Sequence, residues 1–353
     1  MTTTHPQIPT SVKAPVISPA AILQTGLAFW SSKVLLTAVN LDLFTVLGDG
    51  SQTAEEISAK LGLQNRGLYD FLDTLVALRF LYREGKGENA LYCNTLETEI
   101  FLDRKKPSYV GGILTMANNR LYPFWNNLEE ALKTGKPQNE AKDGSEPLFE
   151  TLYADEKRLE LFMDGMTGVQ LGNFIAFSKK FNFAGYKTHC DIGGCSGILS
   201  SQIVVHQPHM QSVSFDLAPV APIAQRQIDA MGVQDKVSIA SGDFFRDPFP
   251  KADLITMGNI LHDWDLETKK MLISKAYEAL PQGGAFVVIE NIIDDERREN
   301  AFGLMMSLNM LIETEGGFDY TKAEFIEWTG EAGFTRVEAM HLTGPTSALI
   351  AYK

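Results

Sequence analysis

Three helices are predicted in the N-terminal part of the chain by the spacing of its apolar residues. From Ala20 to about Leu47 these residues recur every three or four positions, which indicates a long helix. Thr53-Ala54-Glu55-Glu56 has the form of a capping box, so a short helix should begin there and end at Gly62. Asn65 is expected to cap the third helix, whose apolar positions run from Leu68 to Leu78.

A hairpin is predicted after these helices. Residues 80–83 and 90–93 flank the turn sequence Glu84-Gly85-Lys86-Gly87-Glu88-Asn89. Two helices followed by a hairpin have the layout of a winged helix. Residues 107–183 are then expected to be mainly helical and are rich in methionine and aromatic residues, with a polar loop at 133–147.

From Lys187 onward, short apolar runs alternate with helical segments, which is typical of an α/β domain with a parallel sheet. The helical segments include Glu267 to Leu280 and Thr321 to Ala332. The last two strands are joined by Thr343-Gly344-Pro345-Thr346 as a hairpin, so one strand of the sheet must be antiparallel. The candidate strands are residues 188–192, 211–216, 237–241, 252–257, 285–290, 336–342 and 347–352.

A chain of 353 residues is long enough for two domains. The first 19 residues contain four prolines and no apolar signal core, which indicates a flexible arm rather than an export signal. The expected segments are an arm at 1–19, a winged-helix dimerisation domain at 20–106, linking helices beside the substrate pocket at 107–183, and a cofactor-binding domain at 184–353.

Charge narrows the range of partners. The chain carries 31 Lys and Arg against 44 Asp and Glu, a net charge of −13, which opposes binding to nucleic acid or an anionic membrane. The predicted recognition helix offers essentially one cation, Arg66, so dimerisation is favoured over DNA binding. No apolar run approaches the roughly 18 residues that a membrane helix needs. Three cysteines cannot all pair, and a cytoplasmic location is the simplest interpretation.

A glycine-rich turn follows the first strand of the α/β segment. It reads Asp191-Ile192-Gly193-Gly194-Cys195-Ser196-Gly197, and glycine lets the backbone approach a ligand closely. The fingerprint G-x-G-x-x-G would need glycine at position 192, which disfavours a dehydrogenase. The Asp191 carboxylate would instead accept from a cationic amine, such as the amino-acid end of S-adenosylmethionine. A tight turn without a ligand would explain the glycines equally well.

Acids also end the second and third strands of this segment. Asp216, which Leu217 follows, could accept from both ribose hydroxyls, and Asp243 from an adenine amino group with Phe244 against the ring. Each acid could instead be a helix cap or a turn residue. Because parallel strands end at one edge of a sheet, the convergence of both with Asp191 favours a nucleotide crevice.

A histidine follows the fourth strand. His262 comes shortly after Leu254-Ile255-Thr256-Met257, at a strand end where α/β enzymes place chemistry. The pKa of a phenol lies about 3.5 units above that of a histidine, so proton transfer from a phenol to His262 costs about 5 kcal/mol. A carboxylate that stabilises the imidazolium would reduce this cost. Glu290, at the end of the fifth strand, is the first candidate, and Asp319 is the second.

Two other interpretations of His262 stay open. It could cap a helix or pack in the core. It could also bind a divalent cation with Asp263 and Asp265, but no further histidine or cysteine cluster supports this, so we expect no metal. Methionines at helical spacing, such as Met163 and Met305, belong either to a core or to an adaptable apolar pocket for a flat substrate.

Together these motifs resemble those of the plant-type, or acetylserotonin-like, S-adenosylmethionine-dependent O-methyltransferases and their bacterial relatives. The resemblance covers nearly the whole chain, and its most specific element is Leu261-His262-Asp263-Trp264-Asp265-Leu266-Glu267 placed after Asp243-Phe244-Phe245. It implies an α/β fold: a Rossmann-like seven-stranded methyltransferase sheet with an antiparallel last strand pair, and an N-terminal helical winged-helix dimerisation domain. It also implies a homodimer and a small-molecule acceptor, with S-adenosyl-L-methionine converted to S-adenosyl-L-homocysteine.

The resemblance also assigns roles to residues. His262 matches the catalytic base, Glu290 the acid that holds it, and Asp319 a second acid that is usually glutamate. Residues expected around the cofactor are Asp191, Gly193, Gly194, Gly197, Asp216, Leu217, Asp243, Phe244 and Gly258. Residues expected around the substrate are Phe162, Met166, Trp264, Met306 and Met310. Phe29 and Trp30 are candidates for closing the partner's pocket.

The chain departs from the family pattern at two further positions. Gly258 stands where plant members often carry a lysine against the adenine, and Cys195 stands where a third consecutive glycine is common. We therefore expect a metal-independent O-methyltransferase that acts on a hydroxyl of an apolar, aromatic or polycyclic small molecule. The alternatives are a family member that binds the cofactor for hydroxylation or pericyclic chemistry, and a winged-helix regulator that senses a small molecule.

Overall fold

The computed structural model describes residues 17–106, 108–143 and 156–353. The predicted arm therefore lies outside the described residues apart from its last three positions, and so does the end of the predicted loop at 133–147.

The first predicted helix is three helices: α1 (Ala20–Gly26), α2 (Phe29–Asn40) and α3 (Leu43–Leu47). The prediction of a long helix was wrong at two places. Leu27 and Ala28 separate α1 from α2. Asp42 adopts a left-handed conformation with a φ of 58°, which turns the chain between α2 and α3. Apolar spacing alone does not detect such a break.

By length and composition, the segment Ala20–Asn40 is apolar enough to cross a membrane, and 17% of its most apolar window is buried. The sequence expectation did not anticipate this. The segment contains a single charged residue, Lys33, so its scattered polar residues do not offset the apolar ones. One such helix is weak evidence, because a helix that packs against protein passes the same test.

The second predicted helix is α4 (Ala54–Leu61), and its capping box is confirmed. The Thr53 hydroxyl accepts from the backbone N–H of Glu56, and the Glu56 carboxylate accepts from the backbone N–H of Thr53 at 2.8 Å. Gly62 ends the helix with a φ of +67°.

The third predicted helix is α5 (Leu68–Ala77), and the expected Asn65 cap was wrong. Gly67 occupies the cap position with a φ of 84°, and no side chain caps the helix. Asn65 contributes its backbone carbonyl instead, which accepts from the N–H of Leu68 at 3.2 Å.

A small antiparallel sheet completes the winged helix. Its strands lie in the order β1 (Gln52–Thr53), β3 (Leu91–Asn94), β2 (Leu81–Glu84), which confirms the hairpin. A short 3₁₀ turn, η1 (Gly87–Asn89), lies in its loop, and α6 (Leu96–Leu102) follows.

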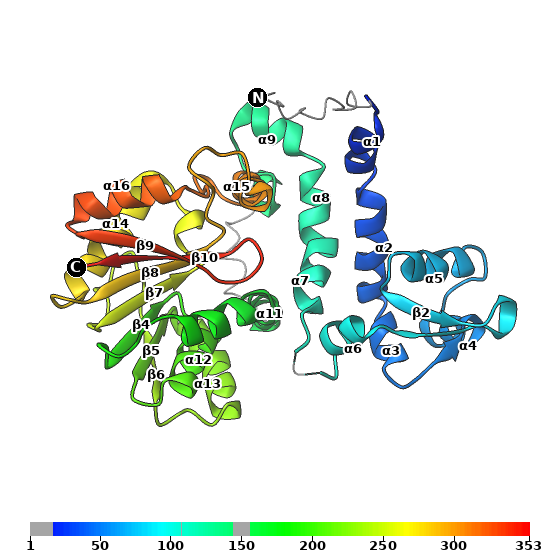
Figure 1. The fold of residues 1–353 in the computed structure, drawn as a ribbon, viewed down its shortest axis with the longest axis horizontal. Coiled ribbons are helices and arrows are strands. Elements are labelled where there is room, and N and C mark those ends of the chain that lie inside the picture. The colour runs from blue at the N-terminus through cyan, green and yellow to red at the C-terminus, as the bar shows by residue number, and fades with distance from the viewer. Residues whose placement is uncertain (1–16, 107, 144–155) are drawn as a thin grey trace, which may run out of the picture.

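Linking helices stand between this unit and the large sheet. In Figure 1, α7 and α8 run beside α2. Close packing of α7 on α11 brings Gly112 and Gly165 together, since a Cβ on Gly112 would lie 3.4 Å from the Cα of Gly165. The elements are α7 (Gly111–Met116), the π-helical turn η2 (Ala117–Leu121), α8 (Tyr122–Trp125), α9 (Leu128–Thr134), η3 (Glu140–Asp143) and α11 (Glu156–Lys180).

The large sheet has seven strands in the order β6-β5-β4-β7-β8-β10-β9. All neighbours are parallel from β6 to β8, whereas β10 is antiparallel to both β8 and β9, which confirms the predicted topology. The strands are β4 (Thr188–Ile192), β5 (Gln211–Asp216), β6 (Val237–Ser241), β7 (Leu254–Gly258), β8 (Ala285–Glu290), β9 (Arg336–His341) and β10 (Ser347–Tyr352).

Helices cover both faces of this sheet (Figure 1). One buried cluster joins the sheet to α14 and α16, and the other joins it to α11, α12 and α13. Because β4 to β8 are parallel, the loops that follow them meet at one edge. The remaining elements are α12 (Ile198–His206), η4 (Ala218–Val220), α13 (Ala221–Ala230), η5 (Leu261–Asp263), α14 (Leu266–Ala279), α15 (Ala301–Glu313) and α16 (Lys322–Ala332).

Candidate active site

The glycine turn after β4 leaves no room for side chains. A Cβ on Gly193 would lie 2.3 Å from the Cδ1 of Ile260, and one on Gly194 would lie 2.3 Å from the Oγ of Ser214. Gly193 and Gly197 also have φ values of +70° and +71°, which disfavour any other residue. Close neighbours and positive φ values therefore explain why glycine stands at these positions of the turn.

Asp191, the second-last residue of β4, lies in a buried chain of hydrogen bonds. Its carboxylate accepts from the Thr256 hydroxyl at 2.6 Å, and the Thr256 oxygen lies 2.8 Å from Nε2 of His189. The other ring nitrogen of His189 contacts the Ser212 hydroxyl at 2.7 Å. Burial raises the pKa of Asp191 to about 7, against the hydrogen bond from Thr256, and burial lowers the pKa of His189 to about 3.

Asp216 closes the glycine turn from the next strand. Its two carboxylate oxygens accept from the backbone N–H groups of Cys195 at 2.8 Å and of Leu217 at 2.7 Å. Burial raises the pKa of Asp216 to about 6, although both amides favour the charged form. The structure therefore brings Asp191 and Asp216 to the same turn, as predicted from their strand ends.

Asp243 and Phe244 lie beyond the end of β6. The Asp243 carboxylate accepts from the N–H of Phe245 at 2.9 Å. Phe244 and Phe245 pack edge to face, and Phe245 does the same with Trp264 at 4.7 Å between ring centres. Trp264, expected near the substrate, is thus grouped with aromatic residues on the expected cofactor side.

Gly258 ends β7 against the ring of Phe174. A Cβ there would lie 3.2 Å from two ring carbons of Phe174, so a larger residue would need that ring to move. At the position where plant members often carry a lysine, Gly258 therefore lies against an aromatic ring from α11.

His262 lies in the turn η5, and Glu290 holds the backbone of that turn. One oxygen of the Glu290 carboxylate accepts from the N–H groups of Ile260, Leu261 and His262 at 3.1, 2.8 and 3.3 Å. Glu290 is completely buried, and burial raises its pKa. Glu290 thus forms its hydrogen bonds with the backbone of the turn and acts on the imidazole only through its charge.

Asp319 is the acid that contacts the imidazole. Its Oδ1 lies 3.3 Å from Nδ1 of His262, and its own N–H is bonded to the Ser307 hydroxyl of α15 at 3.1 Å. Nε2 of His262 lies 3.6 Å from Oδ1 of Asp263. The imidazole is therefore placed between two carboxylates, with a third beneath its backbone.

This surrounding charge controls the protonation of His262. Burial alone would lower the pKa of His262, but Asp263, Asp319 and Glu290 outweigh burial and raise it to about 10. Burial raises the pKa of Asp263 to about 6 against the opposing effect of His262. His262 and Asp263 therefore form an ion pair near neutral pH.

The expected substrate residues lie on two helices. Phe162 and Met166 are half-buried on α11, and Phe162 packs in a cluster with Val220 and Cys195 beside the glycine turn. Met306 is half-buried and Met310 buried on α15, which contacts η5. One group thus lies beside the glycine turn, and the other is on the helix that contacts the His262 turn.

Two protein families match this chain. The O-methyltransferase domain matches residues 125–335, and the O-methyltransferase dimerisation domain matches residues 23–104. The chain belongs to the O-methyltransferase family. It is an enzyme of the S-adenosylmethionine-dependent type, which agrees with the crevice that its sequence predicted.

Curated relatives of this O-methyltransferase match more than nine tenths of its length. It is 38% identical over 338 residues to the tetracenomycin polyketide synthesis 8-O-methyl transferase TcmO of Streptomyces glaucescens, covering 96% of this chain and 98% of the relative. It is 32% identical to acetylserotonin O-methyltransferase of Bos taurus, covering 92% and 95%. Human N-acetylserotonin methyltransferase, solved in complex with SAM, superposes with a TM-score of 0.88 at 27% identity, covering 96% and 99%.

The described residues of the methyltransferase fit S-adenosylmethionine. The bare glycine turn gives a close approach for the ligand, since a Cβ at Gly193 or Gly194 would collide with neighbouring atoms. The buried carboxylate of Asp191 offers an acceptor for an amine, and the partly buried Asp216, whose oxygens accept from the N–H groups of Cys195 and Leu217, keeps further lone pairs for hydroxyls. Within residues 17–106, 108–143 and 156–353, no group of three or more His, Cys, Asp and Glu could hold a metal ion.

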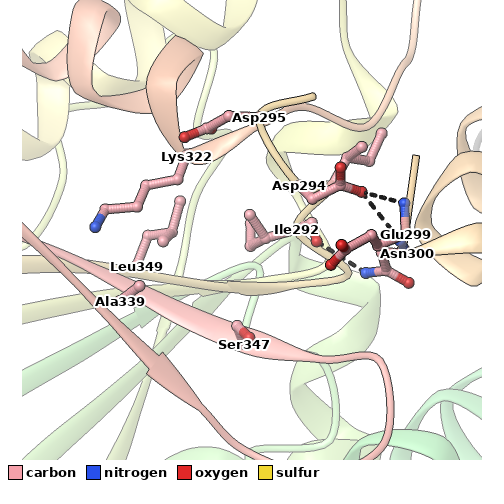
Figure 2. A pocket seen from close by; sticks show the side chains of 10 residues that line it. Ile292, Asp294, Asp295, Glu299, Asn300, Lys322, Ala339, Ser347 and Leu349 are labelled. Carbon is pink, nitrogen blue, oxygen red and sulfur yellow. Dashed lines mark hydrogen bonds between the residues drawn. The ribbon is translucent and has the colours of Figure 1, made fainter. Parts of the chain in front are cut away.

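A separate hollow lies at the surface beside β10 (Figure 2). Asp294 lines it, but its carboxylate is already occupied by the backbone N–H groups of Arg298, Glu299 and Asn300 at 2.8, 2.8 and 3.0 Å. This hollow contains none of the predicted site residues, so we assign it no part in methyl transfer.

Sequence reasoning missed several residues of the site. Thr256 and His189 lie inside strands, where their side chains have no motif to mark them. Lys269 is completely buried on α14 behind the His262 turn, although lysine is almost always exposed. No signal in the sequence marks it, because Lys270 beside it is an ordinary surface lysine of the same helix.

Proposed function

We propose that this enzyme methylates a hydroxyl of an apolar, aromatic and polycyclic small molecule of polyketide type, with His262 as general base. The observation that carries this proposal is the imidazole of His262, held by Asp319 at Nδ1 at the edge of the sheet where the cofactor crevice lies. The names of TcmO and of a 3-hydroxy-5-methyl-1-naphthoate 3-O-methyltransferase, 30% identical, support the substrate class.

The proposed base works through both ring nitrogens. Nδ1–H of His262 donates to Asp319, which fixes the tautomer and leaves Nε2 to take the hydroxyl proton. Asp319 then stabilises the imidazolium, and Glu290 keeps the turn in place through three backbone amides. Bound S-adenosylmethionine would supply an electrophilic methyl group for the hydroxyl oxygen, and its sulfur would keep the electrons of the bond that breaks.

The proposed cofactor contacts follow the strand ends. Asp191 receives the ammonium group, and the glycines at 193, 194 and 197 let the amino-acid part lie on the backbone. Asp216 and Leu217 take the ribose, while Asp243 and Phe244 take the adenine. Gly258 borders the crevice beside Phe174.

For the acceptor, Met306, Met310, Met166 and Phe162 form the proposed apolar walls, since flexible thioethers adapt to flat ring systems. Trp264 borders the pocket from the aromatic group around Phe245.

The proposed assembly is a homodimer through the N-terminal segment 20–106, with linking helices at 107–183 and a catalytic domain at 184–353. The dimerisation-domain match and the exposed side chains of Phe29 and Trp30 support it. Those side chains are the candidates for closing the partner's pocket. We propose no nucleic-acid or membrane partner because the net charge is −13. We propose a cytoplasmic location because Cys93, Cys190 and Cys195 are unpaired.

Methyl-labelled cofactor incubated with polycyclic phenols tests the proposal directly. Label should appear as an aryl methyl ether, and His262→Ala should keep cofactor affinity while losing about 100-fold or more of turnover. Unchanged turnover in the variant would exclude the general base. A relative of 30% identity is named as the N,N-dimethyltransferase OxyT, so amine analogues of the same phenols test for a nitrogen acceptor.

A further inference from the structure

We propose that Lys269 is a positioning residue of the active site, which clamps the turn that carries His262 to the segment that carries Asp319. This inference rests on the proposed function of His262 as the base. Lys269 also supplies the cation that offsets the carboxylates around the imidazole.

One ammonium group contacts both segments. The Nζ of Lys269 donates a hydrogen bond to the backbone carbonyl of Trp264, two residues after His262. The same Nζ lies 3.6 Å from the ring centre of Phe318, the residue before Asp319. A cation over an aromatic face is attracted to it, most strongly where water is excluded. Lys269 thus joins the two halves of the histidine–aspartate pair.

The two segments touch where Lys269 lies. A Cβ on Gly317 would be 2.6 Å from the carbonyl oxygen of His262, and one on Gly316 would be 2.8 Å from the Cβ of Asp265. Because the two backbones are in contact, a shift of one segment displaces the other. A bond to one side and a ring contact to the other therefore set the distance from His262 to Asp319.

The burial of Lys269 needs an electrostatic reason. Its exposed fraction is 0%, and an unpaired buried ammonium is costly. Burial lowers the pKa of Lys269 to about 8, and nearby carboxylates oppose that effect. Asp263, Glu290 and Asp319 face both His262 and Lys269, and Asp265 faces Lys269 alone. Tyr320 lies beside Glu290 and Asp319. The carboxylates favour the charged form of the buried ammonium group, which explains why Lys269 can be buried here.

Lys269→Met removes the ammonium and keeps the length of the side chain. We expect turnover to fall about 10- to 100-fold because the base and its acid lose their relative position. Cofactor affinity should stay unchanged, since the expected cofactor residues lie at the ends of strands and Lys269 lies on the helix α14. The pKa of His262 and the acid limb of the rate profile should both fall, because the imidazole loses the contact with Asp319 that raises its pKa.

The histidine titration is measured by NMR on the full chain with ¹³C-labelled histidine. The chain has six histidines, and the His262 signal is assigned by its loss in His262→Ala. This readout needs neither cofactor nor acceptor. If no phenol is methylated by the unmodified enzyme, the proposed function fails, whereas the NMR titration still decides the role of Lys269.

Three variants complete the test. Lys270→Met removes a cation from the next position of α14, where it pairs with Glu331, and should leave turnover and the His262 titration unchanged. Lys269→Arg should restore the pH profile because it keeps the charge. If Lys269→Met does not fold, Lys269→Gln replaces it, since its amide can still donate to Trp264. An unshifted His262 pKa in the folded neutral variant, or an equal loss in Lys270→Met, would overturn the proposal.

Discussion

At the scale of single residues, the protonation of His262 is the property that most affects turnover. The neighbouring carboxylates raise its pKa to about 10, far above the ordinary value near 6.5. A base must be unprotonated to accept a proton, so a raised pKa means that the active fraction grows as the pH rises.

We therefore predict that the acid limb of the turnover profile lies above pH 7. Initial rates measured from pH 6 to 10 under saturating cofactor check this. Asp263→Asn removes the carboxylate that faces Nε2 and should move the limb to lower pH. A limb at or below pH 6.5 in the unmodified enzyme would contradict the role that we give to these acids.

Asp191 gives a second prediction at this scale. Burial raises its pKa to about 7, so the carboxyl is protonated below that pH and cannot attract an ammonium group. Cofactor affinity should fall as the pH drops from 8 to 5.5, approaching about tenfold per unit well below the pKa. Calorimetric titration in buffers of different ionisation enthalpy measures the proton released on binding.

The control for this prediction is Asp191→Asn. The amide keeps the shape of the side chain but does not titrate in this range. The variant should bind weakly, and most of the pH dependence between 6 and 8 should disappear. A variant that keeps the full pH dependence would assign it to other groups.

At the scale of elements, the contact between the Gly317 segment and η5 is the most sensitive to substitution. In Gly317→Ala the new Cβ would meet the His262 carbonyl at 2.6 Å and the Thr314 hydroxyl at 2.4 Å, so the backbone must shift. A displacement of about 1 Å can cost about 100-fold in rate. We predict that loss in turnover, with cofactor affinity kept.

Gly330→Ala is the matched control. Gly330 lies inside α16, and nothing lies within 4 Å of a Cβ built there. Alanine in a helix is favoured over glycine by about 1 kcal/mol, so this variant should unfold at a slightly higher temperature with unchanged turnover. Equal losses in both variants would show that Gly317 has no special role.

The elements also show what the sequence could predict. The grouping of Asp191, Asp216 and His262 was predictable, because parallel strands bring the residues at their carboxyl ends to the same edge of a sheet. The break at Asp42 was not, because it depends on a left-handed backbone rather than on apolar spacing. The role of Glu290 was not predictable either, because only the folded structure shows that its carboxylate accepts hydrogen bonds from backbone N–H groups of the His262 turn.

At the scale of the whole molecule, the N-terminal helices present an apolar surface that the single chain leaves uncovered. The most exposed of its large side chains on α1 and α2 are Ile22, Leu23 and Trp30, with exposed fractions of 75%, 57% and 61%. A surface of this kind indicates a protein partner. The dimerisation-domain match over residues 23–104 favours a second copy of the same chain.

We predict that Leu23→Asp combined with Trp30→Asp converts a dimer to a monomer, because a charge at the centre of an apolar interface must lose its hydration. Light scattering coupled to gel filtration measures the mass. Leu132→Asp, at a similarly exposed position of α9, should remain dimeric. If the partner's Trp30 helps to close the pocket, the monomer should show a raised KM for the acceptor while its affinity for cofactor stays the same. A double variant that remains a dimer would instead place the interface away from α1 and α2.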